Sequence, residues 1–235
     1  MALDCKVRLV YLEFLAMTTY TMSVEDYLKA IFELSRATGS AVTTEVASRL
    51  AVASASVSAM VRRLTGQGLV SHERYGALKL TKKGRSVALQ LVRRHRVIEA
   101  YLVTALGYAW DEVHSEAERL EHAASPELIN RMAAAIGEPA VDPHGAPIPT
   151  AHGTLEEPKY RTLGDLAVGE KAQIVRVEDE DPELLRYLAS LRFVPGATVS
   201  LVKKEPFEGP LTIRVGSRTH VIGLPLAGRV FVNAA

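Results

Sequence analysis

Residues 43–81 read TTEVASRL (43–50), AVAS (51–54), SVSAMVRRLT (56–65) and LVSHERYGALKLT (69–81), and this stretch decides the fold. Its first and third segments have apolar residues at helical spacing and are joined by a short turn, with Thr43 as the expected N-cap of the first helix. Gly66-Gln-Gly68 ends the second helix, and the last segment predicts two short strands around a Tyr75-Gly76 turn. Helix, turn, helix and β-hairpin together predict a winged helix-turn-helix domain.

Helices are expected on both sides of this domain. Val24–Arg36 has helical apolar spacing and is ended by Gly39. A long helix is expected from Thr81 through Leu106, a second over Asp111–His122, and a third opening with Ser125 as N-cap and Pro126 at the first helical position. These helices have more apolar surface than a small module needs, which predicts a homodimer contact.

The C-terminal part of the chain differs from the rest in its residue pattern. Gly137–Pro158 is rich in Pro and Gly and predicts a linker, in which His144 and His152 are expected to be exposed to solvent. Beyond Thr162, short strands with frequent turns predict a small SH3-like β-barrel, interrupted by one helix at Pro182–Leu191. The expected strands are Lys171–Val177, Thr198–Lys203, Leu211–Val215, Thr219–Gly223 and Gly228–Val232.

The chain is therefore expected to be mainly α-helical with small β parts. The predicted divisions are an N-terminal extension (1–22), the winged helix domain (23–84), a helical dimerisation and metal-binding domain (85–138), a linker (139–160) and the β-barrel (161–235). The first 22 residues contain neither a signal peptide nor a membrane span, and are interpreted as a disordered extension or an early start, with Met17 and Met22 as alternative starts.

Composition indicates an ordinary globular protein, with 48% hydrophobic and 23% charged residues. The single cysteine, Cys5, excludes an intrachain disulfide and favours a reducing cytoplasm. Charge is unevenly distributed: residues 43–85 contain eight Lys/Arg and two Glu, whereas residues 86–158 contain five Arg and eleven Asp/Glu. A basic module beside an acidic one indicates separate binding of a polyanion and of a cation.

The basic module has the residues that a DNA-reading helix needs. Small hydroxyl residues open its second helix and let that helix enter a major groove closely, while basic side chains on the helix and the hairpin reach phosphates or guanines. The alternative interpretation is a solvated basic surface. The candidate DNA-contacting residues are Ser54, Ser56, Ser58, Arg62, Arg63, Arg74 and Lys79.

The acidic module contains His114-Ser-Glu-Ala-Glu-Arg-Leu-Glu-His122. On a helix, its two histidines together with Glu118 and Glu121 share one face about 100° wide. One helix earlier, His95 and Glu99 stand at i and i+4. Imidazole and carboxylate groups projecting together are typical ligands of a divalent transition metal. The alternative is that these are solvated polar residues on amphipathic helices.

These motifs resemble those of the diphtheria toxin repressor family of metal-dependent transcriptional regulators. The resemblance rests on Glu25-Asp-Tyr-Leu, on Leu78-x-Leu-Thr-x-x-Gly84, on Arg94-His-Arg-x-x-Glu99 and on Val113-His-x-Glu-Ala-x-x-x-Glu-His122, and it covers about Ser23 to the C-terminus. It implies a C-terminal domain similar to that of FeoA proteins. It also implies a homodimer that binds double-stranded operator DNA when metal is bound and controls metal-uptake genes.

The resemblance implies a primary metal site made of Asp26, Glu118, Glu121 and His122. Iron-type relatives have Met at the Asp26 position and Cys at the Glu118 position, whereas manganese-type relatives have Asp and Glu. Because carboxylates suit hard Mn²⁺, we expect Mn²⁺, with Fe²⁺ as the alternative. Manganese-type relatives also have a Glu where this chain has Lys29, which cannot ligate while protonated.

An ancillary site of the iron-type pattern is therefore expected instead of the dinuclear manganese-type arrangement. It would comprise His95, Glu99 and His114, completed by a carboxylate from the barrel, either Asp181 or Glu183. Both lie at the end of an acidic run that also has the simpler interpretation of a solvated loop.

Two other classes of function are weighed against the metal-dependent repressor. A His/Glu metalloenzyme would activate water, but the sequence offers no recognisable nucleophile or general base outside the ligand set. A winged helix dimer without metal would leave six coincident ligands without a role. We therefore expect no enzymatic activity, no small organic substrate and no membrane association.

Overall fold

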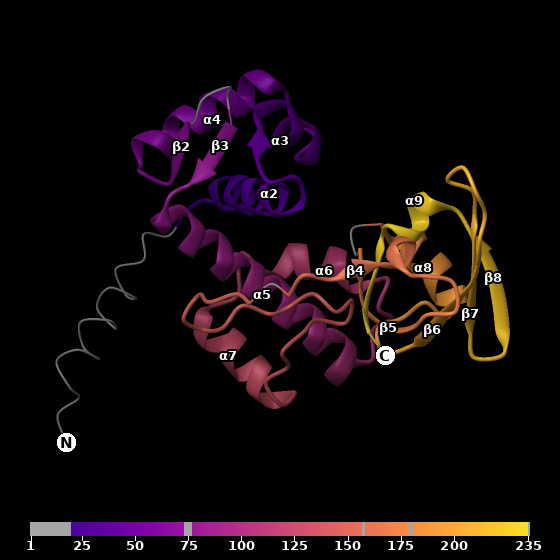
Figure 1. Ribbon diagram of the computed structural model, residues 1–235. Helices are drawn as coiled ribbons and strands as arrows, with labels where there is room; N and C mark the ends of the chain where they lie inside the picture. Colours follow the sequence, from indigo (N-terminus) through magenta and orange to yellow (C-terminus); the bar gives the residue numbers. More distant parts are fainter. Residues whose placement is uncertain (1–19, 73–76, 157, 179–180, 235) are drawn as a thin grey trace. The chain divides into compact units, whose positions relative to one another are not determined.

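The computed structural model describes residues 20–72, 77–156, 158–178 and 181–234 (Figure 1). The chain forms two compact units, residues 1–88 and residues 89–235, which are described separately below. The predicted Tyr75-Gly76 turn and the candidate Arg74 lie outside the described residues. Within the described residues, every helix is too short or too polar to cross a membrane.

Before helix α5, the described part of the first unit contains three helices and a three-stranded antiparallel sheet. In chain order these are α2 (Met22–Thr38), β1 (Ala41–Val42), α3 (Thr43–Arg49), α4 (Ser54–Gly66), β2 (Val70–His72) and β3 (Ala77–Leu80). The strands are ordered β1-β3-β2, with Val70 opposite Leu80 in the hairpin. Leu28, Ile31, Val57, Leu64 and Leu78 are fully buried between them. The predicted winged helix fold is confirmed.

Three local predictions in this unit need correction. Strand β1 was not expected, because two residues carry too little alternation to be recognised. Helix α4 begins at Ser54 rather than Ser56. The N-cap of α3 is Val42 rather than Thr43. The Val42 backbone N–H donates to Glu45 Oε2 at 3.2 Å, so the side chain of a glutamate in the first turn satisfies a backbone donor at the start of the helix. Gly39 ends α2 as expected, with a φ of +82°.

The long helix α5 (Lys82–Leu106) begins where the wing ends. Thr81 Oγ1 donates to the carbonyl of Gly68 at 2.7 Å and accepts from Gly84 N–H at 3.1 Å, which joins the helix start to the hairpin. A Cβ at Gly84 would lie 2.0 Å from the backbone oxygen of Leu69. The glycine of the Leu-Thr-x-x-Gly motif is therefore required by close backbone contact.

The second unit begins with the remainder of α5, followed by α6 (Val113–Leu120) and α7 (Pro126–Ala135). Ser125 caps α7 by accepting from Leu128 N–H at 3.2 Å, as expected. The expected helix over Asp111–His122 is too long at both ends: Glu121 is the C-cap of α6, and His122 lies in the following turn. The apolar residues of this helical core are Val97, Ile98, Leu102, Val113, Ala117, Ala124, Ile129 and Ala133.

The predicted exposure of His144 is wrong. His144 is fully buried, and Asp142 and Ala146 beside it are 4% and 1% exposed. The backbone turns tightly here, because Asp142 Oδ1 accepts from both His144 N–H and Ala146 N–H at 2.9 Å. His152, also assigned to the linker, is exposed as expected. Part of the expected linker is thus folded against the second unit.

The C-terminal part of this unit is an antiparallel sheet with the strand order β4-β9-β5-β6-β7-β8. Its strands are β4 (Arg161–Thr162), β5 (Lys171–Val177), β6 (Thr198–Lys204), β7 (Leu211–Val215), β8 (Arg218–Ile222) and β9 (Val230–Ala234), with helices η2 (Leu163–Asp165), α8 (Pro182–Ser190) and α9 (Leu224–Ala227). Alternate strand residues and Phe193 fill its core. The expected small β domain and its helical insert are confirmed, while β4, η2 and α9 were not predicted.

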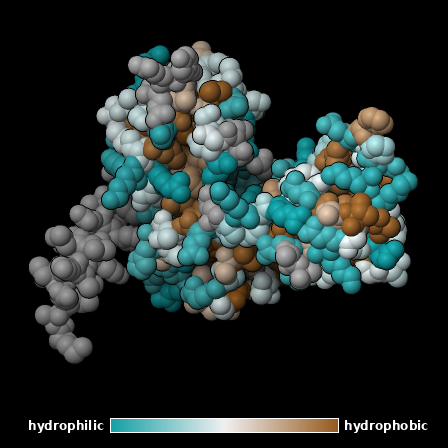
Figure 2. Space-filling view, viewed as in Figure 1, coloured by the Kyte–Doolittle hydropathy of each residue, from teal (hydrophilic) through white to brown (hydrophobic). Residues whose placement is uncertain are grey.

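Exposed apolar side chains gather in separate patches on an otherwise hydrophilic surface (Figure 2). In the helical part of the second unit the large exposed apolar residues include Leu106, Leu120 and Leu128, which are 58%, 44% and 49% exposed. In the β domain, Phe207 is 99% exposed in the connection between β6 and β7.

Candidate metal centre

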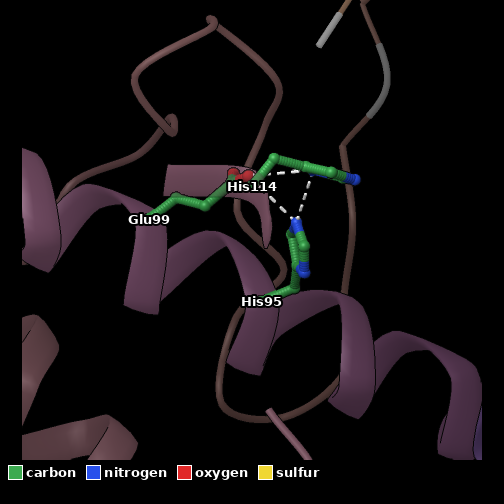
Figure 3. Close-up of side chains that lie close together, drawn as sticks. All are labelled: His95, Glu99 and His114. Carbon is green, nitrogen blue, oxygen red and sulfur yellow. Dashed lines mark hydrogen bonds and ion pairs between the residues drawn. The ribbon is translucent and has the colours of Figure 1, made fainter. Parts of the chain in front are cut away.

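The second unit brings together three of the predicted ligands. His95 and Glu99 project from adjacent turns of α5 toward His114 of α6 (Figure 3). Glu99 Oε1 lies 2.9 Å from His95 Nε2 and 3.2 Å from His114 Nδ1, and the two ring nitrogens are 3.1 Å apart. The i, i+4 spacing on α5 places His95 and Glu99 on one face, and the packing of α6 supplies the third group. The predicted association of these three residues is present.

His95 has a carboxylate at each ring nitrogen. Nε2 faces Glu99, while Nδ1 lies 2.6 Å from Oε2 of Glu121, and all three residues are buried. A ligating histidine is typically oriented by a carboxylate on its second nitrogen. Glu121 can hold the His95 ring in this way through Oε2. The other oxygen of Glu121, Oε1, lies 3.7 Å from His122 Nε2.

Glu99 is completely buried and remains anionic. Burial raises the pKa of this carboxyl, but the charge of His95, hydrogen bonds from His114 and His95, and the charge of His144 lower it, so that the pKa falls well below its ordinary range. Its second oxygen, Oε2, is buried and has no hydrogen bond within the described residues. A buried acceptor without a hydrogen bond is costly, which indicates a place for a cation.

Two further residues close to Glu99 were missed from the sequence. Asp142 and His144 each place one potential ligand atom within 4.8 Å of Glu99 and of each other. His144 Nδ1 lies 3.9 Å from Glu99 Oε2, and its Nε2 lies 2.8 Å from the carbonyl oxygen of Trp110. Asp-Pro-His-Gly was treated as linker composition, although an Asp two residues before a His is a signal for a tight turn that carries both.

Three buried carboxylates lie among these groups. Glu99, Glu121 and Asp142 are all buried carboxylates, and the buried guanidinium nearby belongs to Arg96, whose Nε lies 3.5 Å from Asp142 Oδ2. Buried carboxylates require compensating positive charge. Because the donors are imidazole nitrogens and carboxylate oxygens, a divalent ion such as Mn²⁺, Fe²⁺ or Zn²⁺ fits their chemistry.

The other predicted metal ligands come from several parts of the chain. Glu118 is largely exposed, with Oε1 3.5 Å from His114 Nε2. Asp26 lies near the start of α2 in the first unit, and its combination with Glu118, Glu121 and His122 stays a prediction. Asp181 caps α8, where its Oδ1 accepts from Glu183 N–H at 2.9 Å and from Leu184 N–H at 3.2 Å. Neither Asp181 nor Glu183 joins a ligand group within the described residues.

The candidate DNA-contacting residues lie mainly on α4 of the first unit. Ser54, Ser56, Arg62 and Arg63 are exposed, and Ser58 is half-buried with its hydroxyl donating to Ser54 O at 3.0 Å. Val57, Val61 and Leu64 face the core, so the arginines project from the opposite side of the helix. Lys79 is exposed on β3. Helix α4 therefore presents hydroxyl groups at its start and guanidinium groups two turns later.

Three domain families match the chain in sequence. They are the iron dependent repressor N-terminal DNA binding domain over residues 19–78, the iron dependent repressor metal binding and dimerisation domain over residues 81–150, and the FeoA domain over residues 161–234. In this order, the three matched ranges coincide with the winged helix domain, the helices that carry the candidate metal ligands, and the β domain. The second match includes Asp142 and His144.

Individual proteins that resemble this chain are also metal-dependent repressors or regulators. The iron-dependent repressor IdeR of Mycobacterium tuberculosis is 35% identical over 191 residues, covering 76% of this chain and 83% of the relative. The diphtheria toxin repressor of Corynebacterium diphtheriae is 30% identical over 205 residues, covering 85% of this chain and 84% of the relative. A manganese-dependent transcriptional repressor in complex with manganese superposes with a TM-score of 0.84 at 39% identity, covering 90% of this chain and all of that structure. The manganese regulator SloR has a TM-score of 0.75 at 32% identity, with 90% and 98% of the two chains covered.

Proposed function

Because the chain belongs to the diphtheria toxin repressor family of metal-dependent transcriptional repressors, we propose that it is a Mn²⁺-activated homodimeric repressor in the cytoplasm, which binds operator DNA and controls metal-uptake genes. The observation that carries this proposal is the group of His95, Glu99 and His114, of which His95 and Glu99 are buried and His114 is partly exposed. This family consists of transcriptional repressors rather than enzymes.

Manganese is favoured over iron by the chemistry of the donors. Asp26 and Glu118 supply hard carboxylate oxygens at the positions where iron-type relatives have Met and Cys, and the groups within the second unit contain only nitrogen and oxygen donors. Two of the similar structures are those of manganese-dependent regulators, which supports this choice. Relatives named as iron-dependent repressors match as well, so Fe²⁺ is the second candidate.

In the proposed primary site, Asp26 of the DNA-binding unit and Glu118, Glu121 and His122 of the second unit would hold one ion. A bound ion supplies positive charge that draws these carboxylates together and fixes the two units in one arrangement. Helix α4 would then present Ser54, Ser56, Ser58, Arg62 and Arg63 to DNA, with Arg74 and Lys79 on the wing. Metal increases DNA affinity to the extent that it binds this arrangement more tightly than the others.

Dimer formation would place two copies of α4 on successive half-sites. The exposed residues Leu106, Leu120 and Leu128 offer apolar surface for the contact between subunits, and the matched domain model is that of a dimerisation domain. Recognition of a two-fold operator by a winged helix dimer follows from that symmetry.

The test is retention of a labelled metal-uptake promoter by the purified protein, with Mn²⁺ and then with a chelator. Wild-type protein should bind DNA only with metal. Glu118→Ala should abolish this response while leaving the fold intact, since the side chain is largely exposed and does not fill the core. Glu127→Ala is the matched control, because Glu127 is an exposed helical glutamate that pairs with Arg131. Equal DNA binding with metal and with chelator would refute the proposal, and an unaltered metal response in Glu118→Ala would refute the primary-site assignment.

A further inference from the structure

Two neighbouring arginines of α5, Arg93 and Arg94, each donate from the guanidinium group to a backbone carbonyl of another segment. Arg93 Nη1 donates to Pro149 O at 2.9 Å in the connection after α7. Arg94 Nη1 donates to Glu121 O at 3.1 Å at the end of α6. Consecutive residues of a helix point about 100° apart, so the two guanidinium groups leave α5 in different directions. Arg94 is thus the member of the pair that holds the segment with Glu121.

The end of α6 is a place where such a contact is valuable. Glu121 is the C-cap of this helix, and the last carbonyls of a helix have no partner within it. The chain then turns at once, since Ala124 N–H donates back to Leu120 O at 3.1 Å. A guanidinium is favourable here because it brings positive charge to the negative end of the helix dipole. Arg94 therefore fixes, from α5, the turn that contains Glu121 and His122.

Glu121 is held at two points by consecutive residues of α5. Its backbone oxygen accepts from Arg94, and its carboxylate Oε2 lies 2.6 Å from His95 Nδ1. Glu121 is 2% exposed, so water has little access to either contact. With the backbone and one carboxylate oxygen fixed, the position of the other oxygen, Oε1, is determined as well. Oε1 lies 3.7 Å from His122 Nε2, so α5 sets the spacing of these two ligand atoms.

The charge of Arg94 and its hydrogen bond have opposite effects on a bound cation. A guanidinium beside a cation repels it and lowers its affinity, whereas a guanidinium that holds two ligands in place raises that affinity. Because the contact is to the backbone oxygen of Glu121, it fixes the turn and does not use a carboxylate oxygen. This geometry favours the second effect, and the two effects predict opposite results when the charge is removed.

We propose that Arg94 is a positioning residue for the metal response: its bond to Glu121 O holds Glu121 and His122 where they can bind one divalent cation together. The proposal rests on the proposed function and on its primary site. In this role Arg94 acts through the backbone of a ligand. Loss of an outer partner of a metal ligand typically lowers metal affinity about 10–100-fold, and we expect a loss of this size when the Arg94 guanidinium is removed.

The experiment uses the full-length protein with MnCl₂ as the probe, in a His114→Gln parent whose second site, shared with Glu99, is weakened. Calorimetric titration measures Mn²⁺ affinity, and urea unfolding measures stability. Arg94→Gln removes the charge and the guanidinium, and should bind Mn²⁺ about 10-fold or more weakly than the parent. Arg94→Lys keeps the charge without the planar fork, and should have an intermediate affinity. Tighter Mn²⁺ binding by Arg94→Gln would show that repulsion dominates and would overturn the proposal.

Arg93→Gln is the matched control, because Arg93 makes the same kind of bond to the carbonyl of Pro149. It should lose a similar amount of stability and keep the Mn²⁺ affinity of the parent. Equal losses of affinity in Arg93→Gln and Arg94→Gln would indicate a general structural role and contradict the proposal, as would parental affinity in folded Arg94→Gln. Circular dichroism verifies the fold. Should Arg94→Gln not fold, Arg94→Lys compared with Arg93→Lys decides the same question.

DNA retention measured in parallel separates this proposal from the proposed function. Weaker Mn²⁺ binding by Arg94→Gln, together with metal-independent DNA binding by the wild type, would keep the positioning role and refute the repressor proposal. Metal-dependent DNA binding by the wild type, with parental Mn²⁺ affinity in Arg94→Gln, would do the reverse.

Discussion

Gly145 is the residue on which the position of His144 depends most sharply. Its φ is +90°, and an added Cβ would lie 1.9 Å from the backbone oxygen of Val175 on β5. On either side of it, Val177 N–H donates to His144 O at 2.9 Å and Gly145 N–H donates to Asp142 O at 3.1 Å. Gly145→Ala must therefore move the turn away from β5 and break these contacts.

The expected cost has two parts. An alanine in left-handed backbone costs about 1–2 kcal/mol, of which roughly 0.5 kcal/mol is recovered from the stiffer unfolded chain. Loss of two buried backbone hydrogen bonds adds about 1 kcal/mol each. The free energy of unfolding should therefore fall by about 3 kcal/mol. Gly169→Ala is the matched control, since Gly169 has a φ of +87° but no atom near its Cβ position, and should lose only about 1 kcal/mol.

Urea unfolding followed by the fluorescence of Trp110 would measure both variants. Trp110 is the chain's single tryptophan, and its ring centroid lies 5.6 Å from that of His144, so the signal reports on this part of the second unit. A difference in stability below about 0.5 kcal/mol between the two variants would mean that the close approach to Val175 does not constrain the turn.

Three further predictions address the DNA surface, ion choice and pH. Arg62→Ala should weaken DNA binding across sequences and, where the lost contact is to phosphate, reduce the slope of log affinity against log salt by about one, measured by retention at several salt concentrations. The double variant Asp26→Met, Glu118→Cys should shift activation from Mn²⁺ toward Fe²⁺ or Co²⁺ in titrations of DNA binding, and an unchanged preference would contradict the manganese assignment. A hydrogen bond from Arg161 lowers the pKa of Glu170 to about 2. The Arg161–Glu170 interaction therefore stabilises the fold fully above the unfolded-state pKa of the carboxyl, and this stabilisation is lost as the pH falls toward 2. Arg161→Ala should raise the pKa of Glu170, which an NMR titration would measure.

The helix ends could be predicted from the sequence because interactions between residues close in the chain determine them. Gly39 ends α2 and Ser125 begins α7 through contacts within a few residues. Strand β1 could not be found in this way, because its pairing with Leu78 and Ala77 across more than thirty residues makes it a strand. Gly84 was recognised only as part of a motif. The reason for that glycine, contact with Leu69 O, is a tertiary one.

The candidate metal centre could also be predicted only in part from local sequence. The i, i+4 spacing of His95 and Glu99 is visible in the sequence, and the structure adds His114 at hydrogen-bonding distance. His144 was misjudged because Pro and Gly composition describes a backbone without describing what packs on it. Its burial results from contact with Trp110 and with β5, which lie about thirty residues away on either side along the chain.

His95 connects the two predicted metal sites through opposite sides of one ring. Nε2 faces Glu99, and Nδ1 lies 2.6 Å from Glu121 Oε2, so the same imidazole is a ligand in one site and the orienting partner of a ligand in the other. His95→Gln should therefore weaken Mn²⁺ binding at both sites, with the loss at the Glu121 site about 10–100-fold, as for other outer partners. His114→Gln should weaken mainly the site that it shares with Glu99, because its Nδ1 lies 3.2 Å from Glu99 Oε1 and its other ring nitrogen lies 3.5 Å from the largely exposed Glu118. Calorimetric titration with Mn²⁺ would resolve the binding phases, and identical losses in the two variants would show that His95 does not couple the sites.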